Sequence, residues 1–248
     1  MGDRERDPQG VSVGRVLTLL REGELEEVKG RLPWGSNYSF LMLARDAELE
    51  TYVVYKPRRG EQPLWDFPDG TLCNREVAAY LVSEALGWGI VPPTVLRDGP
   101  HGEGMVQLII EADPNVNYFT LGPEFRPQLQ RIALFDHIVN NADRKGGHCL
   151  LADSGRLWSI DHGICFHASP KLRTVIWDFA TEPIPAGLLR DVGSFCENLA
   201  AGKRLRTQLE KLLSEREIDA LKRRVERLLE TGTYPEPGPG RNYPWPPV

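Results

Sequence analysis

Two aspartates lie in short polar stretches that each follow an apolar run: Asp143 in NADRKGGH and Asp161 in SIDHG. Asp143 follows a predicted helix. Asp161 ends the second of two predicted strands, whose hairpin would bring it back beside residues 143–148. Such a pair of carboxylates suits phosphoryl transfer, in which one orients the attacking group and another holds Mg²⁺ against nucleotide phosphates. The two stretches therefore predict a phosphoryl-transfer site.

The first half of the chain supplies the complementary positive charge. Lys56 ends the strand-like run YVVYK and would point into a cleft from a rigid element. A strand lysine can pair phosphate oxygens and also a helix glutamate, and Glu76 near the start of the next helix is the obvious partner. A turn between two predicted strands, GSNYS, offers backbone amides and hydroxyls that could close over phosphates, from Gly35, Ser36 and Ser39.

The elements that must position these residues follow from the spacing of apolar residues. In the first half, helical spacing occurs at 11–24 and 74–88, and strand-like runs occur at 25–32, 38–44, 51–56, 91–97 and 104–112. Asn74 is expected to cap the second helix and Gly87 to end it. Several strands around one helix predict a small antiparallel-sheet lobe at 11–112, after a disordered leader at 1–10.

The second half is mainly helical. It has helical patterns at 127–141, 184–200 and 215–230, and short strand-like runs at 149–153 and 157–161. These elements predict a second lobe at 113–230 that carries both aspartates. Residues 231–248 are rich in proline and glycine and are expected to form an extended tail, which could be a ligand for a protein partner. The predicted fold class is α+β, with two lobes around a cleft.

Composition narrows the class of protein. The chain has 248 residues, 41% of them hydrophobic, which is enough for a real core. Its net charge of −5 argues against a general nucleic-acid binder. The charged start of the chain does not resemble a signal peptide, and no apolar run is long enough for a transmembrane helix. Four scattered cysteines without a CxxC pair fit reduced thiols, so a cytoplasmic location is expected.

Six stretches, in this order, resemble the phosphatidylinositol 3-/4-kinase-like branch of the protein-kinase-like fold, most nearly the type II phosphatidylinositol 4-kinases and more distantly the HipA-type kinases. They cover roughly residues 30–170 and read GSNYSFLM, YKPRRGEQP, EVAAYLVSEALGWGIVPPT, VQLIIE, NNADR and IDHGICF. The resemblance implies a two-lobe kinase-like fold with ATP and a divalent metal, Mg²⁺ or Mn²⁺, in the cleft between the lobes.

The resemblance also implies a role for each matching residue. Lys56 would bind the α- and β-phosphates while Glu76 holds it, Asp143 would be the catalytic-loop aspartate, and Asp161 would hold the metal. The adenine would meet backbone groups along the VQLIIE stretch, at Gln107, Leu108, Ile109 and Ile110.

His148 departs from the family pattern, which has an asparagine five residues after the catalytic-loop aspartate. An asparagine offers a hard oxygen that suits Mg²⁺, whereas a neutral imidazole nitrogen suits Mn²⁺ or Zn²⁺ better. Three outcomes stay open at this point: an altered metal preference with His148 as a ligand, a site that relies on Asp161 and water, or a weakened domain that mainly binds nucleotide.

Two alternatives to a kinase remain from the residues. One is a catalytically weak nucleotide-binding regulatory module that works through a partner. The other is a metal-dependent hydrolase, because four of the five histidines lie close together in the sequence, at His137, His148, His162 and His167. Their spacing fits no standard ligand pattern. We therefore predict a kinase that transfers the γ-phosphate of ATP to a hydroxyl on an unidentified protein, lipid or small molecule.

Overall fold

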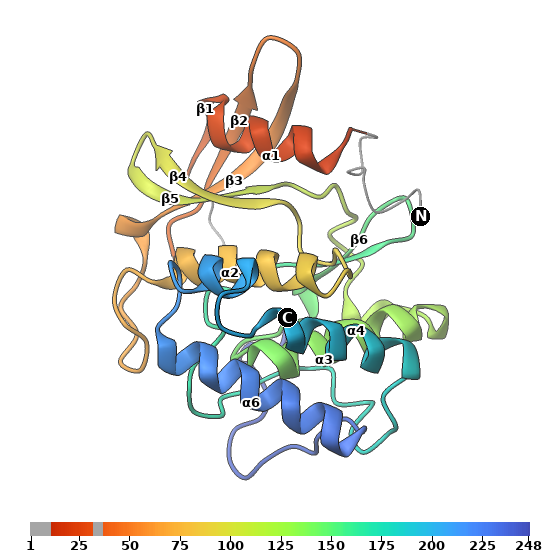
Figure 1. The fold of residues 1–248 in the computed structure, drawn as a ribbon. Helices are drawn as coiled ribbons and strands as arrows, with labels where there is room; N and C mark the ends of the chain where they lie inside the picture. The colour runs from red at the N-terminus through yellow and green to blue at the C-terminus, as the bar shows by residue number, and fades with distance from the viewer. Residues whose placement is uncertain (1–10, 32–36) are drawn as a thin grey trace.

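A five-stranded antiparallel sheet forms one part of the molecule, and helices form most of the other (Figure 1). The computed structural model describes residues 11–31 and 37–248. The strand order is β1 (Glu24–Arg31), β2 (Phe40–Arg45), β3 (Glu50–Pro57), β5 (Gly102–Leu108) and β4 (Thr94–Gly99). The leader predicted at 1–10 and the turn residues 32–36 lie outside the described residues.

The alternation of side chains along β3 explains how the sheet serves two cores. Val53 and Tyr55 are fully buried and pack in the same cluster as Leu19 and Leu20 of helix α1 (Val13–Glu22). Because neighbouring residues point to opposite faces of a sheet, Lys56 lies on the other face. That face is the one that turns toward the second helix.

Helix α2 (Leu72–Ala85) lies between the sheet and the helical part. Cys73 and Val77 pack against Met105 of β5, while Ala78, Ala79 and Val82 belong to the core of the helical part. The helix begins two residues earlier than predicted, because the carboxylate of Glu61 accepts the Leu72 and Cys73 amides in place of the expected Asn74 cap. It ends as predicted near Gly87, which adopts a φ of 68°.

The helical part contains α3 (Arg126–Val139), α4 (Ala186–Asn198), α5 (Arg204–Leu209) and α6 (Glu215–Thr231). The short α5 was not predicted. Single 3-10 turns lie at Arg58–Gly60, Tyr118–Thr120, Pro123–Phe125 and Gly146–His148. No helix in the described ranges is long and apolar enough to cross a membrane.

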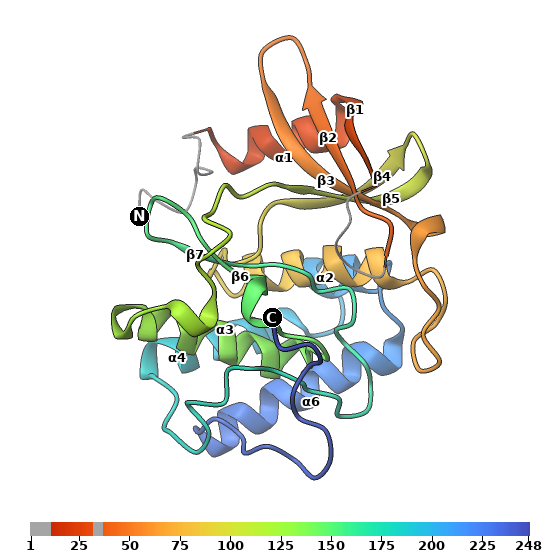
Figure 2. The ribbon, with the colours of Figure 1, turned by 180° about the vertical axis from the view of Figure 1, so that it is seen from behind.

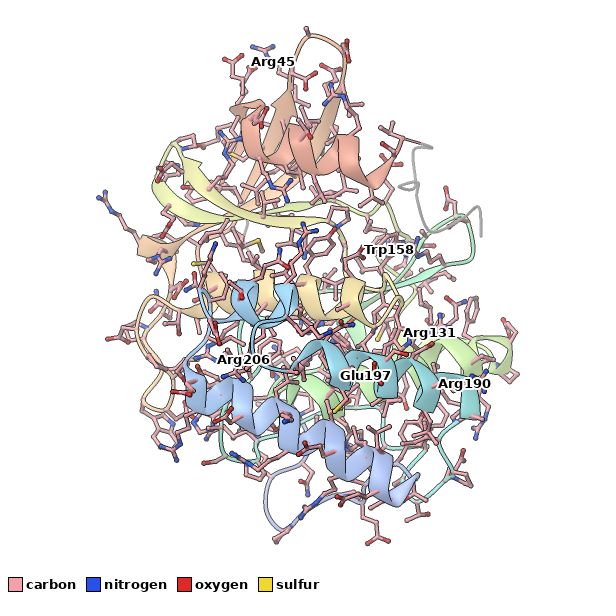
Figure 3. All side chains as sticks on the ribbon, viewed as in Figure 1. Arg45, Arg131, Trp158, Arg190, Glu197 and Arg206 are labelled. Carbon is pink, nitrogen blue, oxygen red and sulfur yellow. The ribbon has the colours of Figure 1, made fainter. Side chains whose placement is uncertain are left out.

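A two-stranded hairpin, β6 (Cys149–Leu151) and β7 (Leu157–Ser159), connects the two parts. Trp158 of this hairpin, labelled in Figure 3, is buried in the core cluster of the sheet, together with Ala152. Leu157 instead belongs to the core of the helical part. Because the hairpin packs against both parts of the molecule, it holds in place the loop before β6 and the loop after β7.

The proline-rich tail runs back over the helical part instead of extending away from it (Figure 2). Tyr234 is buried and donates its hydroxyl to the Gln130 carbonyl. Farther along, the Asn242 carbonyl accepts the Thr174 amide, and the Pro247 carbonyl accepts the Gly146 amide. The backbone of the tail is therefore engaged by the helical part of its own chain.

Candidate active site

Three charged side chains from separate elements meet where the sheet faces the helices. Nζ of Lys56 on β3 lies 2.7 Å from Oε1 of Glu76 on α2 and 2.9 Å from Oδ1 of Asp161 after β7. The side chain of Glu76 is 2% exposed, that of Lys56 22% and that of Asp161 47%, so the cluster opens to solvent beside Asp161. The structure thus brings together three predicted site residues that are far apart in the sequence.

The second carboxylate oxygen of Glu76 fixes the loop that carries Asp161. Oε2 of Glu76 accepts the His162 amide at 2.8 Å. Asp161 itself has a φ of 62°, in the left-handed region that aspartate adopts more readily than most side chains. One buried carboxylate therefore positions both the ammonium of Lys56 and the backbone beside Asp161.

These charges shift one another's proton affinities. The Lys56 ammonium lowers the pKa of Asp161 well below its usual range. Burial favours the neutral amine of Lys56, but the charges of Asp161 and Glu76 outweigh it and raise the pKa of Lys56. Burial also raises the pKa of Glu76, although Lys56 opposes this shift. Lys56 is therefore cationic and Asp161 anionic at neutral pH.

Asp143 lies in the loop that follows α3. Asn140 ends that helix in a left-handed conformation with a φ of 53°, and the Asn141 side chain accepts the Asp143 amide at 3.0 Å. Nζ of Lys145 lies 3.3 Å from Oδ2 of Asp143. Burial raises the pKa of Asp143, with Lys145 opposing the shift. A carboxylate with a raised pKa is a stronger proton acceptor, which suits a general base.

Arg144, the next residue, is fully buried and ties this loop to the rest of the site. Its guanidinium donates to both carboxylate oxygens of Asp136 on α3, at 2.9–3.2 Å. It also contacts the turn before the hairpin at the His148 carbonyl, the end of β7 at Ser159 Oγ, and the loop after it at the Ile160 carbonyl and His162 Nε2. Arg144 therefore fixes the loop of Asp143 and the loop of Asp161 relative to each other.

His148 faces Asp161 across the site. Its Nε2 lies 3.4 Å from Oδ2 of Asp161, and its side chain is 14% exposed. Burial lowers the pKa of His148 to about 4, so the imidazole is neutral at physiological pH. A neutral imidazole nitrogen beside a carboxylate is a donor pair that suits a divalent transition-metal ion.

The predicted nucleotide contacts are placed only in part. Gly35 and Ser36 lie outside the described residues, and Ser39 is buried. Gln107 uses its side-chain amide to bond Thr94. Along the same segment, Leu108 donates its amide to Pro93 and Ile109 donates its amide to Tyr52, both at carbonyl oxygens.

A family model described as phosphatidylinositol 3- and 4-kinase matches residues 72–220, which is more than half of the chain. The chain belongs to this family. A bacterial relative, Protein Rv2133c of Mycobacterium tuberculosis, is 40% identical over 92% of this chain and 94% of its own length. Phosphatidylinositol 4-kinase gamma 4 of Oryza sativa is 31% identical over 48% of this chain, which spans a quarter of that protein.

Solved structures establish the fold of this kinase. The Golgi casein kinase with Mn/ADP bound has a TM-score of 0.57 at 14% identity, over 91% of this chain and 76% of that one. Hydra Fam20 with sugar has a TM-score of 0.55 at 15% identity, over 88% and 87%. Both are kinase-like structures, so the predicted two-lobe, kinase-like α+β fold is confirmed.

The histidines that suggested a hydrolase lie in separate places and make unrelated contacts. His137 packs against the rings of Trp177 and Tyr234, and His167 meets the ring of Phe67. His162 is buried beside Arg144. Within the described ranges, no three His, Cys, Asp or Glu side chains form a group that could hold a metal ion. The hydrolase alternative therefore lacks the ligand cluster it requires.

Several residues of the site were missed from sequence. Asp136, Arg144 and Lys145 all lie in or before the NADRKGGH stretch, but none has a spacing that distinguishes it from an ordinary surface charge. Their tasks became visible only through burial and contact distances. The one available signal was an aspartate inside the apolar helix ALFDHIV, because an acidic residue in a buried helix needs a partner.

Proposed function

We propose that this kinase is an ATP-dependent phosphotransferase that moves the γ-phosphate to a hydroxyl group. The observation that carries the proposal is the assembly of Lys56, Glu76 and Asp161 within hydrogen-bond distance. His148 lies 3.4 Å from Asp161, and Asp143 is near enough for the charge of Asp161 to contribute to its raised pKa. Phosphoryl transfer relies on positioning and on electrostatic stabilisation of phosphate charge, and this arrangement offers both.

Each residue of the site has a role in the proposal. Lys56 pairs oxygens of the α- and β-phosphates, and Glu76 keeps its ammonium in place. Asp143 orients the acceptor hydroxyl and accepts its proton, which its raised pKa favours. Lys145, 3.3 Å from Asp143, adds positive charge where the transferred phosphate would pass.

The donor chemistry fits a divalent cation shared with the nucleotide. Asp161 supplies a carboxylate and His148 a neutral nitrogen, and both side chains reach solvent. Two protein donors leave most coordination positions to water and phosphate oxygens, which is usual for nucleotide-bound Mg²⁺. A bound divalent ion would neutralise phosphate charge. The imidazole donor favours Mn²⁺ over Mg²⁺.

The adenine site is proposed at the segment from Gln107 to Ile110. The amides of Leu108 and Ile109 already donate within the protein. We therefore propose that a base is met by other backbone groups of this segment, at its end beyond β5. Gly35, Ser36 and Ser39 remain predicted phosphate-loop residues. We place the reaction in the cytoplasm.

The acceptor is proposed only as a hydroxyl. The family and the rice relative are named for phosphatidylinositol, whereas one structural neighbour is named a casein kinase. These names cover a lipid and a protein acceptor. Acceptors of both classes therefore belong in the assay.

The test is transfer of radiolabel from γ-labelled ATP, with Mg²⁺ or Mn²⁺, to water, to casein and to phosphatidylinositol vesicles. Asp143→Asn and Asp161→Asn keep the shape of each side chain and should slow transfer about 100-fold or more. Lys222→Met is the matched control, because this half-exposed lysine on α6 is remote from the cluster in the sequence and pairs only weakly with Glu226.

Undiminished transfer by Asp143→Asn and Asp161→Asn would overturn the proposal. Binding of ATP without transfer to any acceptor would instead support the alternative of a nucleotide-binding regulatory module. Circular dichroism of each variant distinguishes loss of chemistry from loss of folding.

A further inference from the structure

The proline-rich tail contacts two segments of the helical part, one of which carries Asp143. The Pro247 carbonyl accepts the Gly146 amide at 2.7 Å. The Asn242 carbonyl accepts both the Thr174 amide and the Trp177 indole N–H, each at 3.1 Å. Gly146 belongs to the loop of Asp143, and residues 174–177 belong to the segment after Asp161. Six residues of tail therefore span the two loops.

The contact between Gly146 and Pro247 lies in the loop that carries Asp143. Gly146 lies three residues after Asp143 and two before His148, and it is buried. A Cβ atom at this glycine would lie 2.7 Å from the ring of Phe119 and 3.5 Å from the Pro247 oxygen. The loop is thus packed against both Phe119 and the tail, and loss of the tail would remove one of these contacts.

The second contact is reinforced within the tail and within the helical part. The Asn242 side-chain amide donates to the carbonyls of Gly238 and Gly240, which sets the bend that presents its own carbonyl. Thr174 is almost fully buried and forms a bridge with Arg144, whose amide donates to the Arg173 carbonyl. The tail is therefore connected through one residue to the arginine that holds both loops together.

The tail does not occupy the site itself. Among the described residues, the hydrogen bonds and ion pairs of Lys56, Asp143 and Asp161 involve residues before position 163. The Asp143 side chain remains 26% exposed. These contacts favour support of the loop over blockade of the acceptor.

We propose that residues 242–247 act as a positioning strap, which holds Gly146 and Thr174 and thereby sets the placement of Asp143 relative to Asp161. The proposal rests on the phosphotransferase function above. Because the strap acts on the loop and not on Lys56 or Glu76, its loss should slow transfer without weakening ATP binding.

The experiment compares the full chain with a chain shortened to residue 240, using transfer from manganese ATP to water as the probe reaction. The shortened chain should show kcat lowered about 10- to 100-fold, the cost of a small misplacement, with the KM for ATP within about twofold. Asn242→Ala should give a smaller decrease. Glu236→Ala is the matched control, because Glu236 is exposed and lies before the strap, and it should behave like the full chain.

Rescue in trans and amide exchange provide readouts that a merely destabilised protein would not give. A synthetic peptide of residues 236–248 should restore kcat to the shortened chain. Hydrogen exchange at Gly146 and Thr174 should accelerate on shortening, while exchange in β2 and β3 stays constant. A shortened chain with normal or faster transfer overturns the strap alone. Absence of transfer by the full chain to water, casein and phosphatidylinositol alike, even with ATP bound, overturns the proposed function and the strap together.

Discussion

At the scale of single residues, His148 distinguishes this site from the family pattern of asparagine. Its imidazole lies 3.4 Å from Asp161 and is neutral because burial lowers its pKa to about 4. Near neutral pH the ring therefore carries a single proton, and one of its two nitrogens keeps a lone pair. We therefore expect the side chain at position 148 to set the preference between Mn²⁺ and Mg²⁺.

His148→Asn should shift metal preference from Mn²⁺ toward Mg²⁺, because an amide oxygen is a harder donor than an imidazole nitrogen. We expect the ratio of transfer rates in Mn²⁺ and Mg²⁺ to fall by about tenfold. Titration of both ions at saturating ATP measures it. His101→Asn, at an exposed histidine near the edge of the sheet, should leave the ratio as it is. An unchanged ratio in His148→Asn would exclude His148 as a metal ligand.

At the scale of elements, helix α2 depends on a side chain from the loop before it. Thr71, at the N-cap position, makes no side-chain capping bond. Glu61 performs that task, accepting the Leu72 and Cys73 amides at 3.0 and 2.9 Å. The carboxylate also lies at the positive end of the helix dipole. The helix that carries Glu76 thus begins where this loop places it.

Glu61→Ala should lower the free energy of unfolding by about 1–2 kcal/mol, the usual effect of removing a helix cap. Urea denaturation followed by circular dichroism measures the change. Glu111→Ala provides the comparison, because Glu111 is exposed. Equal stability of the two variants would show that Glu61 does not cap α2 in solution.

At the scale of the whole molecule, nucleotide binding between the two parts should stabilise the fold. A ligand at about 100 times its Kd adds about 2.7 kcal/mol, which for a chain of this length raises Tm by about 5–10 °C. Thermal melts with ATP and Mn²⁺, with ATP and Mg²⁺, and with ATP and EDTA check this. A rise that depends on the metal is expected. Melts that coincide in all three conditions would contradict a metal–nucleotide site.

Much of this architecture was predictable from the sequence, because the apolar periods of α1, α3 and α6 and the alternation in β3 are local signals. The pairing of Lys56 with Glu76 was predicted from their places on a strand and on the next helix. The contact of Lys56 with Asp161 was not predicted, since it depends on packing across a long separation in the sequence. For the buried Arg144, the sequence offered only the indirect signal of Asp136 inside an apolar helix. The docked tail was not predictable, because its contacts use backbone carbonyls, and a carbonyl carries no residue-specific signal in a sequence.

The division into lobes at 11–112 and 113–230 remains a prediction, and α2 shows why a single boundary is hard to assign. Its sequence position lies in the first range, but Ala78, Ala79 and Val82 pack in the core of the helical part. The hairpin at 149–159 shows the converse, since Trp158 packs with the sheet. Helix α2 and the hairpin thus each pack in the core of the part that lies outside their own range of the sequence.

The anchoring of α2 also bears on how many conformations the resting protein visits. Arg75, one residue before Glu76, is buried and donates to Glu217 of α6 at 2.6 Å and to the Cys165 carbonyl at 2.8 Å. Swinging α2 outward would strand a buried charge, at a cost of about 3–5 kcal/mol. Such a penalty keeps the displaced form below about one molecule in a hundred. The lysine–glutamate pair is thus populated before any ligand arrives, and substrates meet a site that is already assembled.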